Sequence, residues 1–378
     1  MTKAETLIIG KNEKNSILST KKQATKQTTK QDTEAVSAKI NLARRGRSTG
    51  RVTITDVAKA ANVSPMTVSR SIKSPASVQQ NLRDRITTVI KKLGYVPNQA
   101  ASTLASSKSH VIGVIVPSLT NAVFIDTLSG IRDCLGQAGY QFLIGESRYS
   151  ADKESELIAT YMAHAPDGFL LTGIEQQESA RVMLASNNIP AVRMYDLSKS
   201  SHDLTVGFSQ KKAGYSVARH FIERGYQRPA FMAAQLDPRS MKRREGFRKG
   251  LMEAGLNPNL EILLPVPSTI ELGAQLLAKI LAQTPNCDAV FCCNDDLALG
   301  VLFECQRRGI AVPAQMAIVG FNDLPWAAQS IPAITTIVTP RYDIGYVAAE
   351  LLLKTLKGKP IEKARIDLGF ELAIRGST

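Results

Sequence analysis

The sequence predicts a small all-α headpiece with a helix-turn-helix unit, followed by an α/β core of two parallel-sheet lobes. Three observations support this prediction. The excess positive charge is confined to the first 109 residues, two short helix patterns meet at a tight turn, and buried-strand runs alternate with helical patterns from Val111 onward. At 378 residues, 44% of them hydrophobic, the chain exceeds one typical domain, so we expect two or three folding units.

The charge is distributed unevenly along the chain. Residues 1–50 hold 11 Lys/Arg and 4 Asp/Glu, and residues 51–109 hold 9 and 2, so each segment carries +7. Residues 110–378 hold 27 of each sign and are neutral. Solubility alone would not segregate charge in this way, so we expect the N-terminal end to meet a polyanion while the remainder has another task.

The first segment, residues 1–50, is rich in Lys, Ser, Thr and Gln and shows little hydrophobic periodicity. We expect a basic, disordered tail. Its end carries Arg44, Arg45 and Arg47, which with Arg51 can lie along phosphates or in a minor groove. A plain solvated linker explains the same residues equally well.

The second segment, residues 51–97, has the pattern of a helix-turn-helix. Thr55 is expected to cap a first helix that runs to about Ala60, and Asn62 suits the left-handed position of a tight turn. Ser64 followed by Pro65 is a strong start for the second helix. A third helix carries apolar residues at spacings of four, three and four and should end at a glycine, namely Leu82, Ile86, Val89, Leu93 and Gly94.

Residues 98–109 are small and polar around one apolar residue, Leu104. A helix of about seven residues from Asn98 is too short to be stable alone in water. We expect a linker that folds only on a partner.

Residues 110–378 should form the core. Eight buried-strand runs alternate with helical patterns, namely "VIGVIVP", "YQFLIG", "GFLLT", "AVRMYD", "PAFMAA", "AVFCC", "AIVGF" and "TTIVTP". About 270 residues is too many for one ordinary sheet, which favours two lobes with a cleft. Ligands of open parallel sheets sit beyond the carboxyl ends of the strands, and the polar residues expected there are Ser118, Asn121, Glu146, Asp196, Asn294 and Asn322.

Several function classes are disfavoured. The longest apolar runs are far below the roughly 20 residues that cross a bilayer, and the N-terminus is too polar for a signal peptide, so a cytoplasmic location without a membrane partner is expected. Five cysteines without CxxC spacing suit reduced core thiols. No GxGxxG after a strand, GxxxxGK[ST] or HExxH occurs, and the four histidines lack ligand-like spacing. We therefore expect no enzyme, no cofactor and no metal site.

Five stretches together resemble the lactose-repressor (LacI/GalR) family of transcription regulators. They are "TDVAKAANVSPMTVSR", "LGYVPNQAASTLAS", "IGVIVPSLTNAVF", "FCCNDDLALG" and "IVGFNDLPWA", in the family's order and spacing over about residues 52–378. Within the family, "SLTNAVF", "FECQRRG", "VTPR" and "DLGFELAIRGS" resemble the gluconate-operon repressors. The first fifty residues are not part of the family pattern, and Asn62 replaces its usual turn glycine.

The resemblance implies a helix-turn-helix headpiece, a hinge helix and a core like that of type I periplasmic sugar-binding proteins. This core is expected to dimerise and to bind a small molecule. The resemblance implies base contacts by Pro65, Met66 and Arg70, with Met66 on a thymine methyl and Arg70 donating hydrogen bonds. Leu104 matches the hinge leucine that wedges into the minor groove. The implied DNA-contacting set is Thr55, Ser64, Pro65, Met66, Thr67, Ser69, Arg70, Asn98, Ala101 and Leu104.

The resemblance also implies an effector site in the core. Arg243 and Arg341 together would favour an anionic effector such as a sugar acid, because a guanidinium can pair bidentately with a carboxylate. Two alternatives stay open. Asn294 or Asp295 simply caps a helix, or one or both arginines pair with surface carboxylates such as Glu245 or Asp343 and do not contact the ligand. The family's effector-site positions are matched by Ser118, Asn121, Phe124, Asp196, Arg243, Asn294 and Asn322. Two further candidates complete the effector-binding set: Glu146, at the end of a strand, and Arg341, where the chain is expected to return to the first lobe near the mouth of the cleft.

These features predict a transcriptional repressor that binds near-palindromic double-stranded operator DNA as a homodimer. A small effector, gluconate or a related sugar acid, would control operator affinity. A neutral sugar, a sugar phosphate or a co-repressor is the alternative, and a sugar-binding transport protein is a remote one, disfavoured by the basic headpiece.

Overall fold

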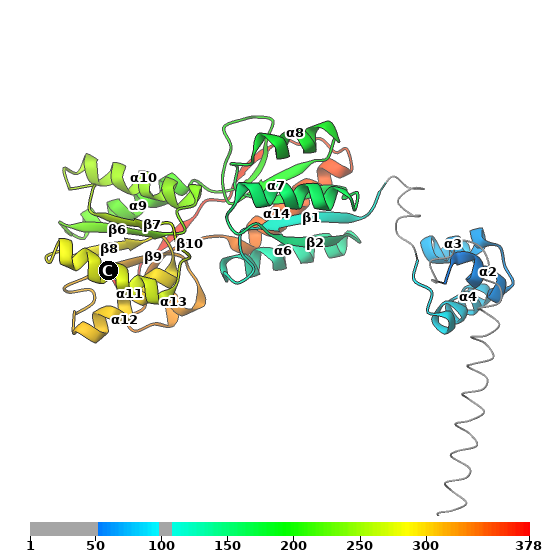
Figure 1. The fold of residues 1–378 in the computed structure, drawn as a ribbon, viewed down its shortest axis with the longest axis horizontal. Helices are drawn as coiled ribbons and strands as arrows, with labels where there is room; N and C mark the ends of the chain where they lie inside the picture. Colours follow the sequence, from blue (N-terminus) through cyan, green and yellow to red (C-terminus); the bar gives the residue numbers. More distant parts are fainter. Residues whose placement is uncertain (1–51, 98–107) are drawn as a thin grey trace, which may run out of the picture. The chain divides into compact units, whose positions relative to one another are not determined.

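The computed structural model describes residues 52–97 and 108–378, and the chain divides into two compact units. The first unit ends at Gln99 and the second begins at Ala100 (Figure 1). No helix among the described residues is long and apolar enough to cross a membrane. The stretches 1–51 and 98–107 lie outside the described residues, so the predictions for the tail, Arg51 and the hinge helix are not tested here.

The headpiece begins with helix α2 (Ile54–Ala61), whose N-cap lies two residues earlier than the sequence predicted. Thr53, not Thr55, is the N-cap. Its side chain accepts a hydrogen bond from the amide of Asp56, and the Asp56 carboxylate accepts one from the Thr53 amide at 2.8 Å. This reciprocal capping box satisfies two free amide groups, whereas Thr55 lies exposed in the first turn. The prediction of Thr55 as the cap is wrong.

The rest of the headpiece follows the predicted pattern. Asn62 ends α2 in the left-handed region, with φ 51°. Ser64 caps α3 (Pro65–Lys73), and Gly94, with φ 63°, ends α4 (Gln80–Leu93). The three helices, with the short helix η1 (Pro75–Ser77), bury a core of Val57, Ala58, Ala61, Val68 and Ile86. The helix-turn-helix prediction is confirmed.

The core consists of two lobes, each built on a six-stranded sheet. The sheet of lobe 1 has the order β11-β5-β4-β3-β1-β2 and is wholly parallel. Its strands are β1 (Val111–Val116), β2 (Gln141–Glu146), β3 (Gly168–Thr172), β4 (Ala191–Met194), β5 (Leu204–Gly207) and β11 (Arg365–Asp367).

The sheet of lobe 2 has the order β12-β10-β9-β8-β6-β7 and is parallel except for the antiparallel pair β10–β12. Its strands are β6 (Pro229–Ala234), β7 (Glu261–Leu264), β8 (Ala289–Cys292), β9 (Ala317–Asn322), β10 (Thr335–Val338) and β12 (Glu371–Ala373). All eight predicted runs contain strands. The sequence analysis missed β5, β7, β11 and β12, which are short and less continuously apolar.

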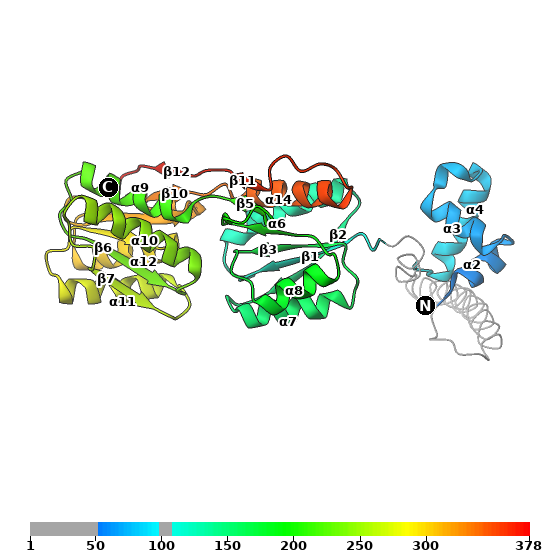
Figure 2. The same cartoon turned by 90° about the horizontal axis from the view of Figure 1, so that it is seen from above.

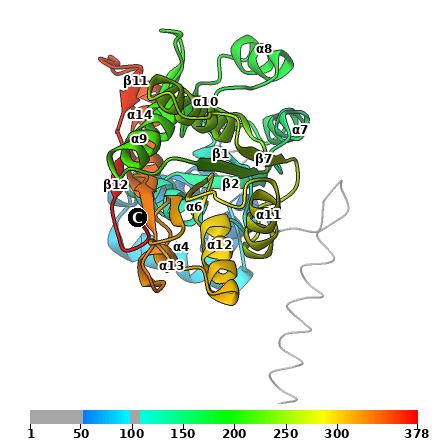
Figure 3. The same cartoon turned by 90° about the vertical axis from the view of Figure 1, so that its left-hand side faces the viewer.

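Helices cover both faces of each sheet. In lobe 1, α6 (Val123–Gln137) pairs with α14 (Arg341–Leu356) on one face, and α7 (Ala151–Met162) with α8 (Glu178–Ser186) on the other (Figure 2). In lobe 2, α9 (Gln210–Glu223) pairs with α10 (Pro238–Glu253), and α11 (Ile270–Gln283) with α12 (Asp295–Arg308) (Figure 3). The short α13 (Pro325–Gln329) follows β9.

Glycines allow the α6–α14 and α9–α10 pairs to pack closely. A Cβ at Gly130 or Gly345 would lie closer than 3.0 Å to backbone of the partner helix in lobe 1, and a Cβ at Gly214 or Gly246 would do so in lobe 2. Both lobes therefore use backbone-to-backbone helix contact at the same place in the fold.

The chain crosses between the lobes three times. The crossings follow β5, β10 and β11, so each lobe is assembled from separate stretches of sequence. All five cysteines are buried and unpaired, which confirms the prediction of reduced core thiols.

Candidate functional site

The exposed face of α3 is the first candidate site. Pro65, Met66 and Arg70 are all exposed, and the Met66 side chain retains 65% of its accessible surface. Met66 and Arg70 are four residues apart and share one face, with the Arg70 guanidinium 3.7 Å from the Met66 sulfur. A large exposed methionine beside an arginine is a surface able to contact both a methyl group and a hydrogen-bonding base edge.

The hydroxyl-bearing residues predicted to contact DNA differ in their burial and in whether the helix cap already uses their hydroxyl groups. The Ser64 hydroxyl accepts from the Thr67 amide at 3.1 Å and lies 2.9 Å from the Thr67 hydroxyl, so both belong to the helix cap. Ser69 is half-buried and Thr55 is exposed. The described headpiece, residues 52–97, carries seven Lys/Arg and two Asp/Glu, a net +5. The remaining predicted DNA contacts, Asn98, Ala101 and Leu104, lie outside the described residues.

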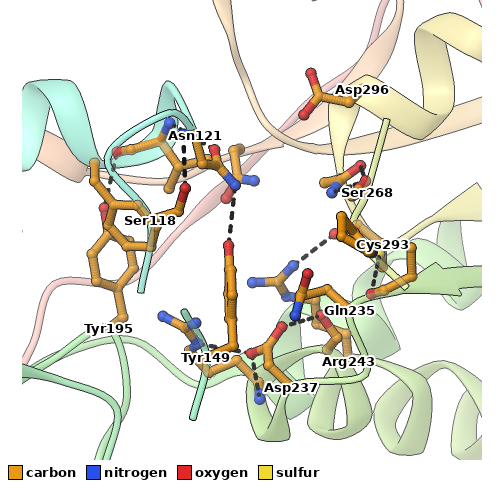
Figure 4. A pocket seen from close by; sticks show the side chains of 18 of the residues that line it. Ser118, Asn121, Tyr149, Tyr195, Gln235, Asp237, Arg243, Ser268, Cys293 and Asp296 are labelled. Atoms are coloured by element: carbon orange, nitrogen blue, oxygen red, sulfur yellow. Dashed lines mark hydrogen bonds and ion pairs between the residues drawn. The ribbon is translucent and has the colours of Figure 1, made fainter. Parts of the chain in front are cut away.

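The second candidate site is a pocket of about 190 Å³ between the two lobes (Figure 4). It lies beyond the carboxyl ends of strands from both sheets, as expected for this fold. Six of the nine predicted effector residues line it: Ser118, Asn121, Phe124, Arg243, Asn294 and Asn322. Its volume lies below the roughly 300–1,000 Å³ typical of drug-sized ligands, which favours a small ligand.

The lobe 1 wall of the pocket is neutral. Ser118 and Asn121 lie in the turn between β1 and α6, and the Ser118 hydroxyl accepts from the amides of Thr120 and Asn121 at 3.2 Å. The Asn121 amide oxygen accepts from the Val123 amide, and its nitrogen donates to the Tyr149 hydroxyl at 3.3 Å. No lobe 1 residue that lines the pocket is charged.

The lobe 2 wall is charged, and Arg243 is its most constrained member. Its Nε donates to the Gln210 amide oxygen at 2.7 Å and one terminal nitrogen donates to the Cys293 carbonyl at 2.6 Å. The guanidinium centre lies 3.6 Å from the centroid of the Phe321 ring. Burial lowers the pKa of Arg243 to about 10, so it remains a cation at neutral pH. Its other terminal nitrogen has no recorded partner within residues 108–378.

Arg239 and Asp237 extend this wall at the start of α10. Asp237 caps the helix, and its carboxylate accepts from the Arg239 Nε at 2.9 Å and from the Ser240 hydroxyl at 2.8 Å. Burial alone would raise the pKa of Asp237, but Arg239 and Arg243 hold it below its usual value. The terminal nitrogens of Arg239 make no recorded hydrogen bond in the described core. Two buried guanidinium groups therefore offer free donors to the pocket.

Three predicted effector residues do not line the pocket. Asp196 is bound by the Lys242 ammonium at 2.6 Å and by its neighbour's amide. Arg341 pairs with Asp126 and donates to backbone carbonyls at the end of β9, including that of Asn322. Glu146 accepts from the Leu119 amide at 2.9 Å. These side chains tie together the loops and lobes that surround the pocket.

Lys242 also bridges the lobes. Its ammonium, on α10 of lobe 2, lies 2.6 Å from Asp196 and 2.6 Å from Glu175, both in lobe 1. The alternative of a surface carboxylate is confirmed for Arg341, which pairs with the half-exposed Asp126 and does not line the pocket. It is not confirmed for Arg243, because Glu245 pairs with Lys211 instead.

Asn294 has a structural role and a pocket position together. Its side-chain oxygen accepts from the Leu297 amide at 3.0 Å and caps α12, and its nitrogen donates to the Ser268 hydroxyl at 2.7 Å. The capping interpretation is thus confirmed for Asn294, while the residue also lines the pocket.

Sequence reasoning missed several polar residues of the pocket, among them Tyr149, Asp237, Arg239 and Asp296. For two of them a signal existed. Asp237 lies three residues after the end of the buried run "PAFMAA" and precedes a proline, which marks a helix start near the carboxyl end of a strand, and Arg239 follows the proline. Tyr149 carried no such signal.

The pocket suits binding of an acid with hydroxyl groups. Free guanidinium nitrogens can donate to a carboxylate, and the neutral hydroxyls and amides together with the Asp296 carboxylate can bind hydroxyls. No histidine lines the pocket, and the described residues contain no group of three His, Cys, Asp or Glu able to hold a metal ion.

Two family models match the chain. A model described as "Bacterial regulatory proteins, lacI family" matches residues 53–98, and one described as "Periplasmic binding protein-like domain" matches residues 218–378. The first covers the headpiece and the second covers most of lobe 2 together with α14.

Known proteins resemble the chain over most of its length. The HTH-type transcriptional regulator GntR of Pseudomonas aeruginosa is 48% identical over 333 residues, 88% of this chain and 97% of that protein. The crystal structure of transcription regulator GntR from Chromobacterium violaceum is 47% identical, with TM-score 0.69, over 71% of this chain and 98% of that one. The Lac repressor dimer bound to operator and the anti-inducer ONPF is 25% identical, with TM-score 0.76, over 86% and 99%.

Proposed function

The chain belongs to the lacI family of bacterial regulatory proteins and is a DNA-binding transcriptional regulator, and on that premise we propose that it is a repressor controlled by a sugar acid. It binds a near-palindromic operator as a homodimer. The acid binds between the lobes of the core and changes operator affinity. The observation that supports the acidic effector is the pair of buried arginines, Arg239 and Arg243, whose free nitrogens face a small polar pocket.

The functions that we propose for the segments follow the distribution of charge along the chain. Residues 51–97 read the operator through Met66 and Arg70, residues 98–109 form the hinge, and residues 110–378 bind effector and the second subunit. The tail, residues 1–50, adds non-specific attraction to phosphate. Because the partner is operator DNA, we place the protein in the cytoplasm, and we assign it no enzymatic step.

The electrostatics of the pocket support an acid over a neutral sugar. Asp237 satisfies one Arg239 nitrogen, but the terminal nitrogens of Arg239 and one of Arg243 remain available. A buried cation without a full set of acceptors is costly, and a ligand carboxylate supplies them. Gluconate is the specific candidate, in line with the resemblance to gluconate-operon repressors and with the relatives named GntR.

A neutral sugar remains the second candidate, because Asp296 and the amides of Asn121 and Asn294 can bind hydroxyls without help from the arginines. A sugar phosphate would use the same arginines as the acid. Whether the ligand weakens or strengthens operator binding depends on which lobe arrangement it prefers.

Calorimetric titration of the full chain with gluconate, 6-phosphogluconate and glucose tests the effector class. We expect gluconate to bind at least tenfold more tightly than glucose, since a buried carboxylate gains charge-assisted hydrogen bonds. Equal binding of glucose would contradict the acidic effector and leave the family assignment intact.

Operator binding has its own test, independent of the ligand. Affinity should fall steeply with salt, because the basic headpiece displaces counterions, and Arg70→Ala should relax preference at one base pair of each half-site by about 1–3 kcal/mol. Uniform loss over all operator variants would make Arg70 a phosphate contact.

A further inference from the structure

Tyr149 occupies a strained turn at the rim of the pocket. It follows β2 and precedes α7, and both it and Arg148 have positive φ angles, 59° and 52°. Neither residue is glycine or asparagine, and the left-handed region is unfavourable for side chains of this kind. Two consecutive left-handed residues persist only where the surroundings hold them, and such strain concentrates at functional sites.

The surroundings hold this turn firmly on both sides. The Ser147 amide donates to the Val116 carbonyl at the end of β1, and the Ser150 amide donates to the Ser147 carbonyl at 3.0 Å. The Ser150 hydroxyl caps α7. Glu146 links the turn to the Ser118–Thr120 loop through the Leu119 amide. The conformation of Tyr149 is therefore fixed by the two loops that form the neutral wall.

The fixed conformation points the phenol into the pocket. In Figure 4 the Tyr149 hydroxyl points toward Asn121, which donates to it, and Asp237 lies at the opposite end of the ring. Within residues 108–378 no acceptor is recorded for the phenol hydrogen. Burial raises the pKa of Tyr149, so this hydrogen stays in place at neutral pH. The pocket thus holds an unused donor on its neutral side.

We propose that Tyr149 is a specificity-determining residue whose hydroxyl donates a hydrogen bond to a hydroxyl of the effector remote from its carboxylate. This inference rests on the proposed function. The acid group lies on Arg239 and Arg243 of lobe 2, and the carbon chain extends toward Asn121 and Tyr149 of lobe 1. We therefore expect a remote hydroxyl of a six-carbon acid to contact Tyr149, and a four-carbon acid to contact the arginines without it.

With this arrangement the site would distinguish sugar acids by the length of their carbon chain. A site that hydrogen-bonds a ligand hydroxyl disfavours a ligand lacking it, because the buried donor is then left without a partner. The bond would also join the two lobes through the ligand, because the carboxylate would lie on lobe 2 and the remote hydroxyl on lobe 1.

The test is a titration cycle of two proteins and two ligands. Full-length wild type and Tyr149→Phe are titrated with gluconate, which has six carbons, and threonate, which has four. Since one hydrogen bond contributes about 1 kcal/mol, Tyr149→Phe should bind gluconate about 5- to 10-fold more weakly. Threonate should bind both proteins equally. Tyr161→Phe is the matched control, because its hydroxyl bonds the Ile144 carbonyl of the same lobe and does not line the pocket.

The outcomes separate this inference from the function on which it rests. Equal loss for gluconate and threonate, or no loss for either, overturns the role of Tyr149 while the acidic effector stands. A wild type that binds neither acid overturns both. A similar loss in Tyr161→Phe would indicate a general change of lobe 1 and would also overturn the assignment.

Discussion

The two lobes of the core share one architecture and differ in what they present to the ligand. Their sheets have equivalent strand orders, and each has a helix pair joined at glycines. Yet the pocket wall of lobe 1 carries only neutral side chains, while lobe 2 contributes all four charged ones, Asp237, Arg239, Arg243 and Asp296.

This difference shows that the position of the pocket and the choice of ligand depend on different parts of the sequence. The repeated fold determines where the pocket lies, because both sheets direct the carboxyl ends of their strands toward the same space. The residues that follow the strands determine what binds there. In the proposed function, lobe 2 supplies the charge that attracts an acid, and Asn121 and Tyr149 of lobe 1 help to distinguish one acid from another.

The largest expected effect comes from removing charge from the lobe 2 wall. Arg243→Ala should weaken gluconate binding by about 2–5 kcal/mol, because a buried carboxylate loses a charged partner. Asn121→Ala, the matched change in lobe 1, should cost only about 1 kcal/mol, the contribution of a neutral hydrogen bond. Calorimetry of both variants, after thermal unfolding has confirmed that each is folded, measures the asymmetry. Equal losses would mean that the walls are equivalent.

The next effect concerns a charge that lobe 1 buries away from the pocket. Burial raises the pKa of Glu154, a residue only 7% exposed, to about 7. The folded state therefore binds more protons than the unfolded chain between about pH 4.5 and 7, and stability falls as pH rises through that window. Glu154→Gln should remove this fall and raise the free energy of unfolding at pH 8, relative to pH 4, by up to about 3 kcal/mol.

Urea denaturation at several pH values measures this dependence. Glu156→Gln on the same helix is the control, since its side chain is 65% exposed and pairs with Lys153 at the surface, and it should leave the pH profile unchanged. A profile for Glu154→Gln that parallels the wild type would show that the carboxylate is fully solvated or neutralised by Arg193.

The glycine contacts test whether the shared architecture has equal consequences in both lobes. Gly214→Ala and Gly130→Ala should each destabilise the core by about 1–3 kcal/mol, because the added Cβ meets backbone of the partner helix. Only Gly214→Ala should also weaken effector binding, since its Cβ would press on the backbone of Arg243. Thermal unfolding together with calorimetry checks both statements. Loss of binding in both variants would show that the helix pairs act on the pocket alike.

The smallest expected effect concerns the ion pairs that join the lobes. Lys242→Met removes the bridge to Glu175 and Asp196 and leaves the buried Asp196 without its cation. Effector affinity should fall by about 1 kcal/mol, because partly exposed pairs contribute little. Lys249→Met on the same helix removes a pair within lobe 2 and should have no effect. A difference between the variants that persists at 1 M salt would argue against an electrostatic origin.

The sequence predicted most of the fold because its signals are local. Strand runs such as "VIGVIVP" and the Ser64–Pro65 helix start depend on neighbouring residues alone. The cap of α2 was misplaced by two residues because Thr53 and Thr55 are both plausible caps, and only the carboxylate of Asp56 selects Thr53. Strands β11 and β12 escaped detection because each is three residues long and is stabilised by pairing with distant strands.

The candidate site was less predictable than the fold. Arg341 was placed in the pocket because of its position at a crossing between lobes, but its partner Asp126 lies 215 residues away in sequence. Arg239 and Tyr149 line the pocket because α10 and the turn after β2 converge there, and convergence of distant segments leaves no local pattern. Tyr149 in particular depends on two left-handed residues that no propensity predicts.

The threefold crossing of the chain constrains how the protein is made on the ribosome. The first five strands of lobe 1 are complete at Gly207, but its helix α14 and strand β11 lie at residues 341–367. At about 5–20 residues per second, lobe 1 waits on the order of 8–30 s of translation for its last strand. During that interval the face of α6 that later packs on α14, and the edge of β5, remain available to chaperones. Lobe 2 likewise needs β12, so neither half can finish folding well ahead of the other, and the sensor becomes competent only as synthesis reaches its final residues.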